Sequence, residues 1–467
     1  MFAGKIWKLN ATDIAAAVKR GDISAIEAVD AHLERIAAVN PKVNAATQVL
    51  AQSARAAAAQ VDADRKTGKP LGALAGVPFT VKESLDVAGA ATTLGVPALK
   101  NAIAAEDAIV VERLRRAGAI PIAHTNLPDL SLRFHTSSQL YGATINPWDS
   151  GRSPGGSSGG DGVAVGTGMA PIALGTDAGG SVRLPAAFAG VTALKPGFGR
   201  LPSLRGPSVT LATQLFPVDG PLARSVGDLR AIFPLLAGPD TRDPRVADVE
   251  LWLPVPKEPM RVGLVFDPDG QGVDPAVKAA VEQAAKALAG AGYEVEPVEL
   301  PHAAEALDLY GRMILTEFNL IWPRLSALLQ PNGQRYIKLF MDERKPATLE
   351  EYVGFTARRF SIMQEWAGLF DRFPVILGPN FTEQAVEPDF DVKTPESFRF
   401  VQKGMRLDSI TSFMGVPSVA VPAGITQGLP QSVQLIGRPY REDLCLLVAE
   451  TLEKHFGRIT PIDPRGK

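Results

Sequence analysis

Two serines in separate glycine-rich segments and one lysine are the residues whose types and spacing best suit chemistry. Ser157 lies in GRSPGGSSGG (151–160), and Ser181 lies 24 residues further on in TDAGGSVR (176–183). A serine hydroxyl is a weak nucleophile until a neighbouring base takes its proton. A lysine such as Lys82 can be that base when burial lowers its pKa and leaves it neutral. The pattern indicates covalent catalysis by a serine, with a lysine in place of histidine.

The residues before Ser181 suit a site that stabilises negative charge. Ala178, Gly179 and Gly180 carry no bulky side chain, so their N–H groups and that of Ser181 can turn toward one developing oxyanion. Ser181 is then the nucleophile, and Ser157 relays its proton to the base. A glycine-flanked serine can adopt unusual backbone geometry, including a non-proline cis peptide bond, which we expect at Ser157.

Three other interpretations of the Gly/Ser segment compete with this one. A flexible linker disagrees with the apolar run VAVGTGMAPIALGT (163–176), and a phosphate-binding loop lacks the Gly-Lys-Ser/Thr ending. A hydrolase nucleophile turn at Ser157 requires a preceding strand and later acid and histidine partners. The preceding DSGRSPGG is instead turn-forming, and His302 and His455 fit ordinary helix positions. The serine–lysine interpretation accounts for more residues than any of these alternatives.

The elements that must position these residues alternate between strand and helix. Two such units can be recognised: strand 76–82, helix 107–117 and strand 119–125, then strand 261–266, helix 274–290 and strand 293–298. Strands separated by helices of this length predict an α/β fold with a mixed, mostly parallel twisted sheet that helices cover on both faces. In the first strand we expect Phe79 and Val81 to face the core and Lys82 to point into the site.

The chain is predicted to be one large domain, within which a capping box marks the start of an early helix. Its parts are an N-terminal helical region, a core that carries the catalytic motifs, and the remainder of the sheet with the substrate pocket: 1–70, 71–200 and 201–467. The helix begins at Ser24, with Glu27 three residues later. We expect Asn40-Pro41 to end it, because the residue before proline avoids the α region.

Composition excludes several classes of protein. The net charge of −2 argues against nucleic-acid binding, and no apolar run of about 20 residues is present to span a bilayer. The N-terminus lacks the pattern of a signal peptide, and Cys445 is the one cysteine. No His/Cys/carboxylate cluster has the spacing of metal ligands. We therefore expect a cytoplasmic protein with no metal, no cofactor, and no nucleic-acid or membrane partner.

The motifs together resemble the amidase signature family, and they occur in the family's order. The matching segments are GVPFTVKESLDVAGAATTLG (76–95), INPWD (145–149), GRSPGGSSGG (151–160), LGTDAGGSVRLPAAFAGVTALKP (174–196), GVPSVAVPAG (415–424) and QLIGRP (434–439). The resemblance implies the amidase signature fold and a Ser–cisSer–Lys triad. In that triad Lys82 is the base, Ser157 the cis-serine and Ser181 the nucleophile that forms the acyl-enzyme.

The resemblance also implies roles for residues around the triad. The amides of residues 178–181 match the oxyanion hole. Supporting positions in the motifs are Ser158, Asp177 and Arg183, and an Asp177–Arg183 pair is expected to serve loop architecture. Phe134 and His135 lie where family members shape the acyl pocket. Phe134 would pack on an aryl or alkyl group and His135 would contact the rim, with structural packing as the alternative for both.

The implied activity is hydrolysis of a carboxylic amide to the acid and ammonia or an amine. We expect a small, neutral, partly hydrophobic amide as substrate, and the family suggests a homodimer. The alternative is the glutamine-hydrolysing A subunit of a tRNA-dependent amidotransferase; a catalytically silent scaffold disagrees with the presence of all three triad residues. Asp161 and Gly162 stand where the family usually has small residues such as Ser or Ala, and Gly197 stands where it often has threonine, so a subfamily assignment is weakened.

Overall fold

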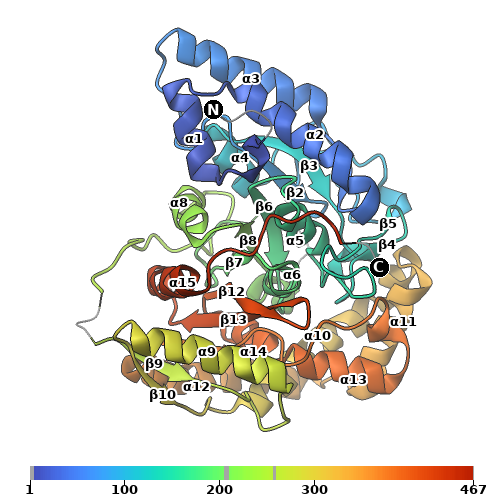
Figure 1. The fold of residues 1–467 in the computed structure, drawn as a ribbon. Helices are drawn as coiled ribbons and strands as arrows, with labels where there is room; N and C mark the ends of the chain where they lie inside the picture. The colour runs from blue at the N-terminus through green and yellow to red at the C-terminus, as the bar shows by residue number, and fades with distance from the viewer. Residues whose placement is uncertain (1–4, 204–209, 256–258, 466–467) are drawn as a thin grey trace.

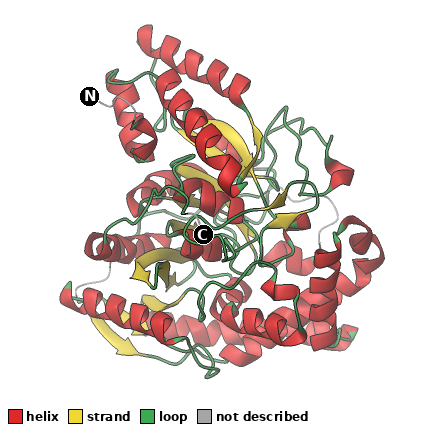
Figure 2. Ribbon diagram, turned by 45° about the vertical axis from the view of Figure 1, so that its right-hand side comes forward, coloured by secondary structure: helices red, strands yellow, loops and turns green. Residues whose placement is uncertain are grey.

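A single eleven-stranded sheet runs through the computed structural model, which describes residues 5–203, 210–255 and 259–465. Its strand order is β1-β3-β2-β6-β8-β7-β12-β13-β11-β9-β10, and β4 pairs with β5 in a separate hairpin. Helices surround the sheet (Figures 1 and 2). The strands are β1 (Ala46–Val49), β2 (Pro78–Lys82), β3 (Ile120–Thr125), β4 (Ser137–Ser138), β5 (Gly142–Ala143), β6 (Ile172–Asp177), β7 (Thr192–Lys195), β8 (Val218–Ala223), β9 (Arg261–Leu264), β10 (Glu294–Pro297), β11 (Val375–Pro379), β12 (Ser418–Thr426) and β13 (Leu429–Gly437).

The sheet is mixed, as predicted, but its parallel part is smaller than predicted. Strands β2, β3 and β6 pair in parallel near one edge, and β9, β10 and β11 do so at the other. The helices α4 (Ile109–Arg116) and α9 (Pro275–Gly290) make the β2–β3 and β9–β10 crossovers. The middle strands from β6 to β13 are antiparallel. There β12 and β13 form a hairpin whose turn residues, Gln427 and Gly428, both have positive φ, as a tight turn of this kind requires.

Helices cover both faces, because successive strand residues point to opposite sides. In β6, Ile172 and Leu174 belong to the largest apolar cluster, whereas Ala173 belongs to another on the opposite face. The first face carries α1 (Ala11–Arg20), α2 (Ala25–Val43), α3 (Ala51–Lys66), α4, α8 (Val226–Leu236), α9 and α15 (Glu442–Phe456). The other carries α5 (Gly159–Gly166), α6 (Arg183–Ala189), α10 (Ala303–Leu325), α12 (Leu349–Arg372) and α14 (Arg406–Met414), and the remaining helices are α7 (Leu211–Leu215), α11 (Pro331–Glu343) and α13 (Pro395–Gly404).

The predicted start of α2 is confirmed, and its predicted end is wrong. Ser24 caps the helix and forms a capping box with Glu27. The helix continues past Asn40 to Val43, with Pro41 inside it. Proline removes one backbone donor, but Asn40 stabilises this last turn. Its carbonyl accepts the Asn44 N–H at 2.7 Å, and its side chain accepts two backbone N–H groups just beyond.

Glycines let α5 pack directly on the backbone of its neighbours. A Cβ on Gly160 would lie 2.4 Å from the Asn126 nitrogen at the end of β3, and one on Gly162 would lie 2.7 Å from the Pro185 oxygen in α6. All eight residues of α5 are buried. The glycine-rich sequence therefore serves close packing, which fixes the start of α5 against the ends of the parallel strands.

The C-terminal tail returns across the molecule to the N-terminal half. Figure 1 shows the dark red chain after α15 running back toward β4 and β5. Along this path the Ile462 N–H donates to the Gly166 carbonyl and the Arg465 N–H to the Pro147 carbonyl, both at 2.9 Å. In the described part of the chain, no helix combines the length and apolar character needed to cross a membrane. The division at residues 70 and 200 stays a prediction, and the first part also contributes the edge strand β1.

Candidate active site

Lys82 ends β2 with its side chain fully buried and directed at a serine. Its Nζ donates to Ser157 Oγ at 2.7 Å and to Thr176 Oγ1 at 2.9 Å. The same strand places Phe79 and Val81 in the main apolar core, so alternation along the strand turns Lys82 to the other face. The structure thus gives Lys82 the orientation that the sequence predicts for it.

Ser157 lies in the turn that leads into α5. The peptide bond between Gly156 and Ser157 is cis, the geometry expected from the sequence. Ser157, Thr176 and Ser181 line one cavity of about 390 Å³. The Ser158 N–H donates to the Ser181 carbonyl at 3.1 Å, which joins the two glycine-rich turns. Lys82, Ser157 and Ser181 are therefore brought together at the carboxyl ends of β2 and β6.

The turn from Ala178 to Ser181 follows β6 and borders the cavity. Ala178 and Ser181 both line it. The Gly180 N–H donates to Asp177 Oδ1 at 2.8 Å, so this one of the four predicted oxyanion donors is engaged within the protein. Gly180 has a φ of 118°, which a residue with a side chain would rarely adopt. Tyr310 Oη donates to the Ala178 carbonyl at 2.9 Å and fixes the first peptide of the turn.

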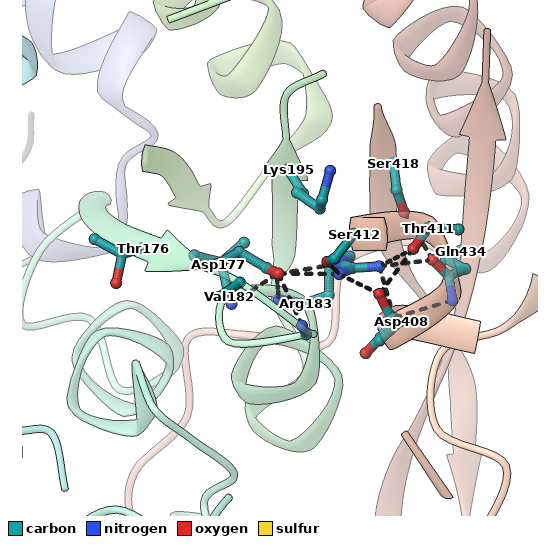
Figure 3. A network of polar contacts seen from close by, with 12 residues as sticks. Thr176, Asp177, Val182, Arg183, Lys195, Asp408, Thr411, Ser412, Ser418 and Gln434 are labelled. Atoms are coloured by element: carbon teal, nitrogen blue, oxygen red, sulfur yellow. Dashed lines mark hydrogen bonds and ion pairs between the residues drawn. The ribbon is translucent and has the colours of Figure 1, made fainter. Parts of the chain in front are cut away.

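A buried network of charged side chains holds this turn against α14 (Figure 3). Asp177 accepts hydrogen bonds from the N–H groups of Gly180 and Val182. It also forms an ion pair with Arg183 at 2.9 Å, as predicted. Arg183 also pairs with Asp408 of α14 at 2.9 Å and donates to Thr411 Oγ1 at 2.6 Å. Gln434 Nε2 donates to Asp408 Oδ1 at 3.0 Å. One guanidinium therefore connects the turn after β6 to α14 and β13.

Burial and charge act in opposite directions on the two aspartates of this network. Burial raises the pKa of Asp177, but the charge and hydrogen bonds of Arg183 outweigh it and hold that pKa well below its usual range. Burial raises the pKa of Asp408 to about 7, because Arg183 offsets the burial only in part. Lys195 lies beside the network, and burial lowers its pKa to about 7. Its Nζ donates to the Val416 and Pro196 carbonyls rather than to a serine.

A second cavity, of about 150 Å³, adjoins the first, and Ala178, Ser181 and Ile314 line both. Phe134 lines the second cavity together with Tyr310, Ile314, Phe318, Tyr336, Ile337, Phe340 and Met405. Arg133 also lines it, with its charge paired to Asp389 at 2.8 Å and Asp391 at 2.7 Å. His135 is not among the lining residues. It is buried, its Nδ1 lies 3.0 Å from Ser153 Oγ, and burial together with the Arg133 charge lowers its pKa to about 4.

Several residues of the site were not identified from the sequence. Thr176 contacts Lys82, and only its position two residues before the turn could have indicated it. Tyr310 and Asp408 lie more than a hundred residues beyond the glycine-rich segments 151–160 and 174–196, so no local pattern connects them to the serines. No group of three or more His, Cys, Asp or Glu residues within 5–203, 210–255 and 259–465 is arranged to hold a metal ion.

The amidase family model matches residues 27–446 of this sequence. The chain belongs to the amidase family. It is 39% identical to an indoleacetamide hydrolase of Bradyrhizobium diazoefficiens, over 97% of this chain and 88% of that protein. It is 33% identical to the A subunit of the glutamyl-tRNA(Gln) amidotransferase of Carboxydothermus hydrogenoformans, over 97% and 98% of the two chains.

A solved structure agrees with this assignment. A bacterial aryl acylamidase of the amidase signature family superposes with a TM-score of 0.83 at 26% identity, over 96% of each chain. The predicted family, fold class and enzyme class are therefore confirmed: the amidase is an amide-hydrolysing enzyme with an α/β fold around one large mixed sheet.

Proposed function

We propose that this amidase hydrolyses a neutral amide with an aromatic or bulky apolar acyl group, through Lys82, Ser157 and Ser181. The observation that carries the proposal is the 2.7 Å contact between Lys82 Nζ and Ser157 Oγ, in a cavity that Ser181 also lines. A lysine that contacts one serine, with a second serine lining the same cavity, can move a proton without histidine. Phe134 and the other apolar side chains of the second cavity support the acyl preference.

The proposed reaction passes through an acyl-enzyme. Neutral Lys82 takes the Ser157 proton while Ser157 takes that of Ser181, whose Oγ attacks the amide carbonyl. The N–H groups of Ala178, Gly179 and Ser181 stabilise the oxyanion, and each such donor contributes about 3–4 kcal/mol to lowering the barrier. The relay then protonates the leaving nitrogen. Water releases the acid by the same proton transfers in reverse.

The charge around the acyl cavity favours a neutral acyl group. Among its described lining residues, Arg133 carries the formal charge, and Asp389 and Asp391 already pair with it. An acyl group that carries an ammonium and a carboxylate would lose its hydration there without gaining a free counter-charge. Similarity to an indoleacetamide hydrolase supports an arylacetic acyl group.

A glutamine-hydrolysing subunit is the second candidate, and it rests on the 33% identity to the amidotransferase chain over nearly the whole sequence. A subunit of that kind acts with partner chains, whereas the free enzyme needs none. The apolar acyl cavity and the higher identity to the indoleacetamide hydrolase favour the free enzyme.

Ammonia release by the purified chain tests the proposal on indoleacetamide, phenylacetamide, acetamide and glutamine. We expect turnover of the two aryl amides that disappears in Ser181→Ala and in Lys82→Met. Lys195→Met is the matched control, because Lys195 is equally buried but donates to carbonyl groups away from the serines. The Lys195→Met protein that folds should have the activity of the wild type. Turnover of glutamine alone, or aryl-amide turnover that survives in Ser181→Ala, would overturn the proposal.

A further inference from the structure

A buried carboxyl group that the proposed reaction does not use lies on the first turn of α5. Asp161 has no solvent exposure. Its Oδ1 accepts a hydrogen bond from Thr125 Oγ1 at 2.5 Å, and its Oδ2 has no hydrogen-bond partner among the described residues. A carboxylate can accept about four hydrogen bonds, and burying it with so few is costly unless a charge compensates. Asp161 is also a departure in the sequence, because the amidase signature family usually has a small residue at this position.

The strand register brings this carboxyl group to Lys82. Thr125 of β3 is the partner of Lys82 of β2 in a parallel pair. Paired residues on neighbouring strands project from the same face, and the strands lie about 4.8 Å apart. Asp161 reaches that face from α5, since it bonds Thr125 directly. The positive charge of Lys82 accordingly favours the ionised form of Asp161 and lowers its pKa, against the burial that raises it.

Other charged groups on the elements around α5 face elsewhere. His124 of β3 alternates to the opposite face, beside Val81, where Glu83 acts on it. Asp177 of β6 and Arg183 of α6 pair with each other. Asp219 of β8 accepts from Ser203 at 2.8 Å. Among these charged groups, Lys82 is therefore the one whose charge acts on Asp161.

We propose that Asp161 is a positioning residue that titrates together with Lys82 and sets the pH at which Lys82 becomes a neutral base. The inference rests on the proposed function, because it gives Lys82 that role. While Asp161 is ionised, its charge stabilises protonated Lys82 and moves the loss of the lysine proton to higher pH. Burial raises the pKa of Asp161 to about 7, so Asp161 gains its negative charge near neutral pH.

Asp161→Asn tests the inference through the pH profile of kcat/KM, which reports the groups of the free enzyme. Removing the negative charge lowers the pKa of Lys82, so the acidic limb should move to lower pH by about 1–3 units, the usual effect of one close opposite charge. Asp408→Asn is the matched control, because Asp408 is also fully buried with a raised pKa but faces Arg183. The acidic limb of Asp408→Asn should lie at the same pH as that of the wild type, even if the value of kcat/KM itself changes. Coincident limbs for Asp161→Asn and the wild type would overturn the inference.

The rate of labelling Ser181 with an uncharged fluorophosphonate, followed by intact mass, gives the same profile without an amide substrate. If the wild type is labelled at Ser181 but releases no ammonia, the proposed substrate is refuted, and the labelling profile still tests this inference. If the wild type is not labelled at Ser181, the proposed function and this inference are both refuted. Thr125→Val serves if Asp161→Asn does not fold. It removes a hydrogen bond that favours ionised Asp161, so its acidic limb should shift in the same direction by a smaller amount, and an unshifted limb counts against the inference.

Discussion

Replacing Arg183 by methionine should destabilise the amidase because it leaves two buried carboxylates without their common cation. Arg183 has no solvent exposure and pairs with Asp177 and Asp408, each at 2.9 Å. Breaking a buried ion pair by removing one partner costs about 3–5 kcal/mol. The unfolding entropy of about 2.1 cal/mol/K per residue gives about 1 kcal/mol/K for the 467 residues. The Tm should therefore fall by about 3–5 °C, which differential scanning calorimetry measures.

The pH dependence of this loss distinguishes charge from packing. Without Arg183, the buried Asp177 and Asp408 have pKa values above their unfolded values, so the folded state binds protons more tightly and gains stability as the pH falls. The deficit against the wild type should be smaller at pH 5.5 than at pH 8. Arg20→Met is the control: its ion pair with Asp22 is exposed, so the change should stay within about 1 kcal/mol. A deficit equal at both pH values, or as small as that of the control, would refute the reasoning.

Three further substitutions test the site. Thr176→Val removes the 2.9 Å contact to Lys82 Nζ and should lower kcat by about tenfold with little change in KM, measured by steady-state ammonia release; an unchanged kcat would show that Thr176 does not hold the lysine. Gly180→Ala should lower both Tm and activity, because the new Cβ would lie 2.6 Å from Asp408 Oδ2 at a φ of 118°, and a fully active, stable variant would contradict the turn geometry. Phe134→Ala should lower kcat/KM for phenylacetamide at least tenfold more than for acetamide, since it removes an aromatic wall of the acyl cavity, and equal losses would argue that Phe134 only packs.

Local signals in the sequence were enough to predict the motifs and many of the elements. The alternation in β2 predicted the direction of Lys82, and the Ser24 cap predicted the start of α2. The pairing of Asp177 with Arg183, six residues apart, was likewise within reach of a local motif. Each of these depends on residues that lie close together in the chain.

Features that depend on distant contacts could not be predicted in this way. Asp408 comes from α14, and its role depends on how that helix packs against the turn after β6. Asp177 accepts a hydrogen bond from the Gly180 N–H, and the small residues of the turn did not indicate this side-chain contact. The antiparallel centre of the sheet arises because β8 lies between β6 and β7, and because β12 pairs with β7, which is far from it in sequence. The extension of α2 through Pro41 depends on hydrogen bonds to Asn40 that form only in the folded chain.

Trapping the acyl-enzyme tests the central claim most directly. The amidase would be mixed with phenylacetamide, quenched in acid within milliseconds, digested and analysed by mass spectrometry. The account predicts a phenylacetyl group on the peptide that contains Ser181, present in the wild type and absent in Ser181→Ala. A phenylacetyl group on Ser157 or another residue, or one that persists in Ser181→Ala, would contradict it.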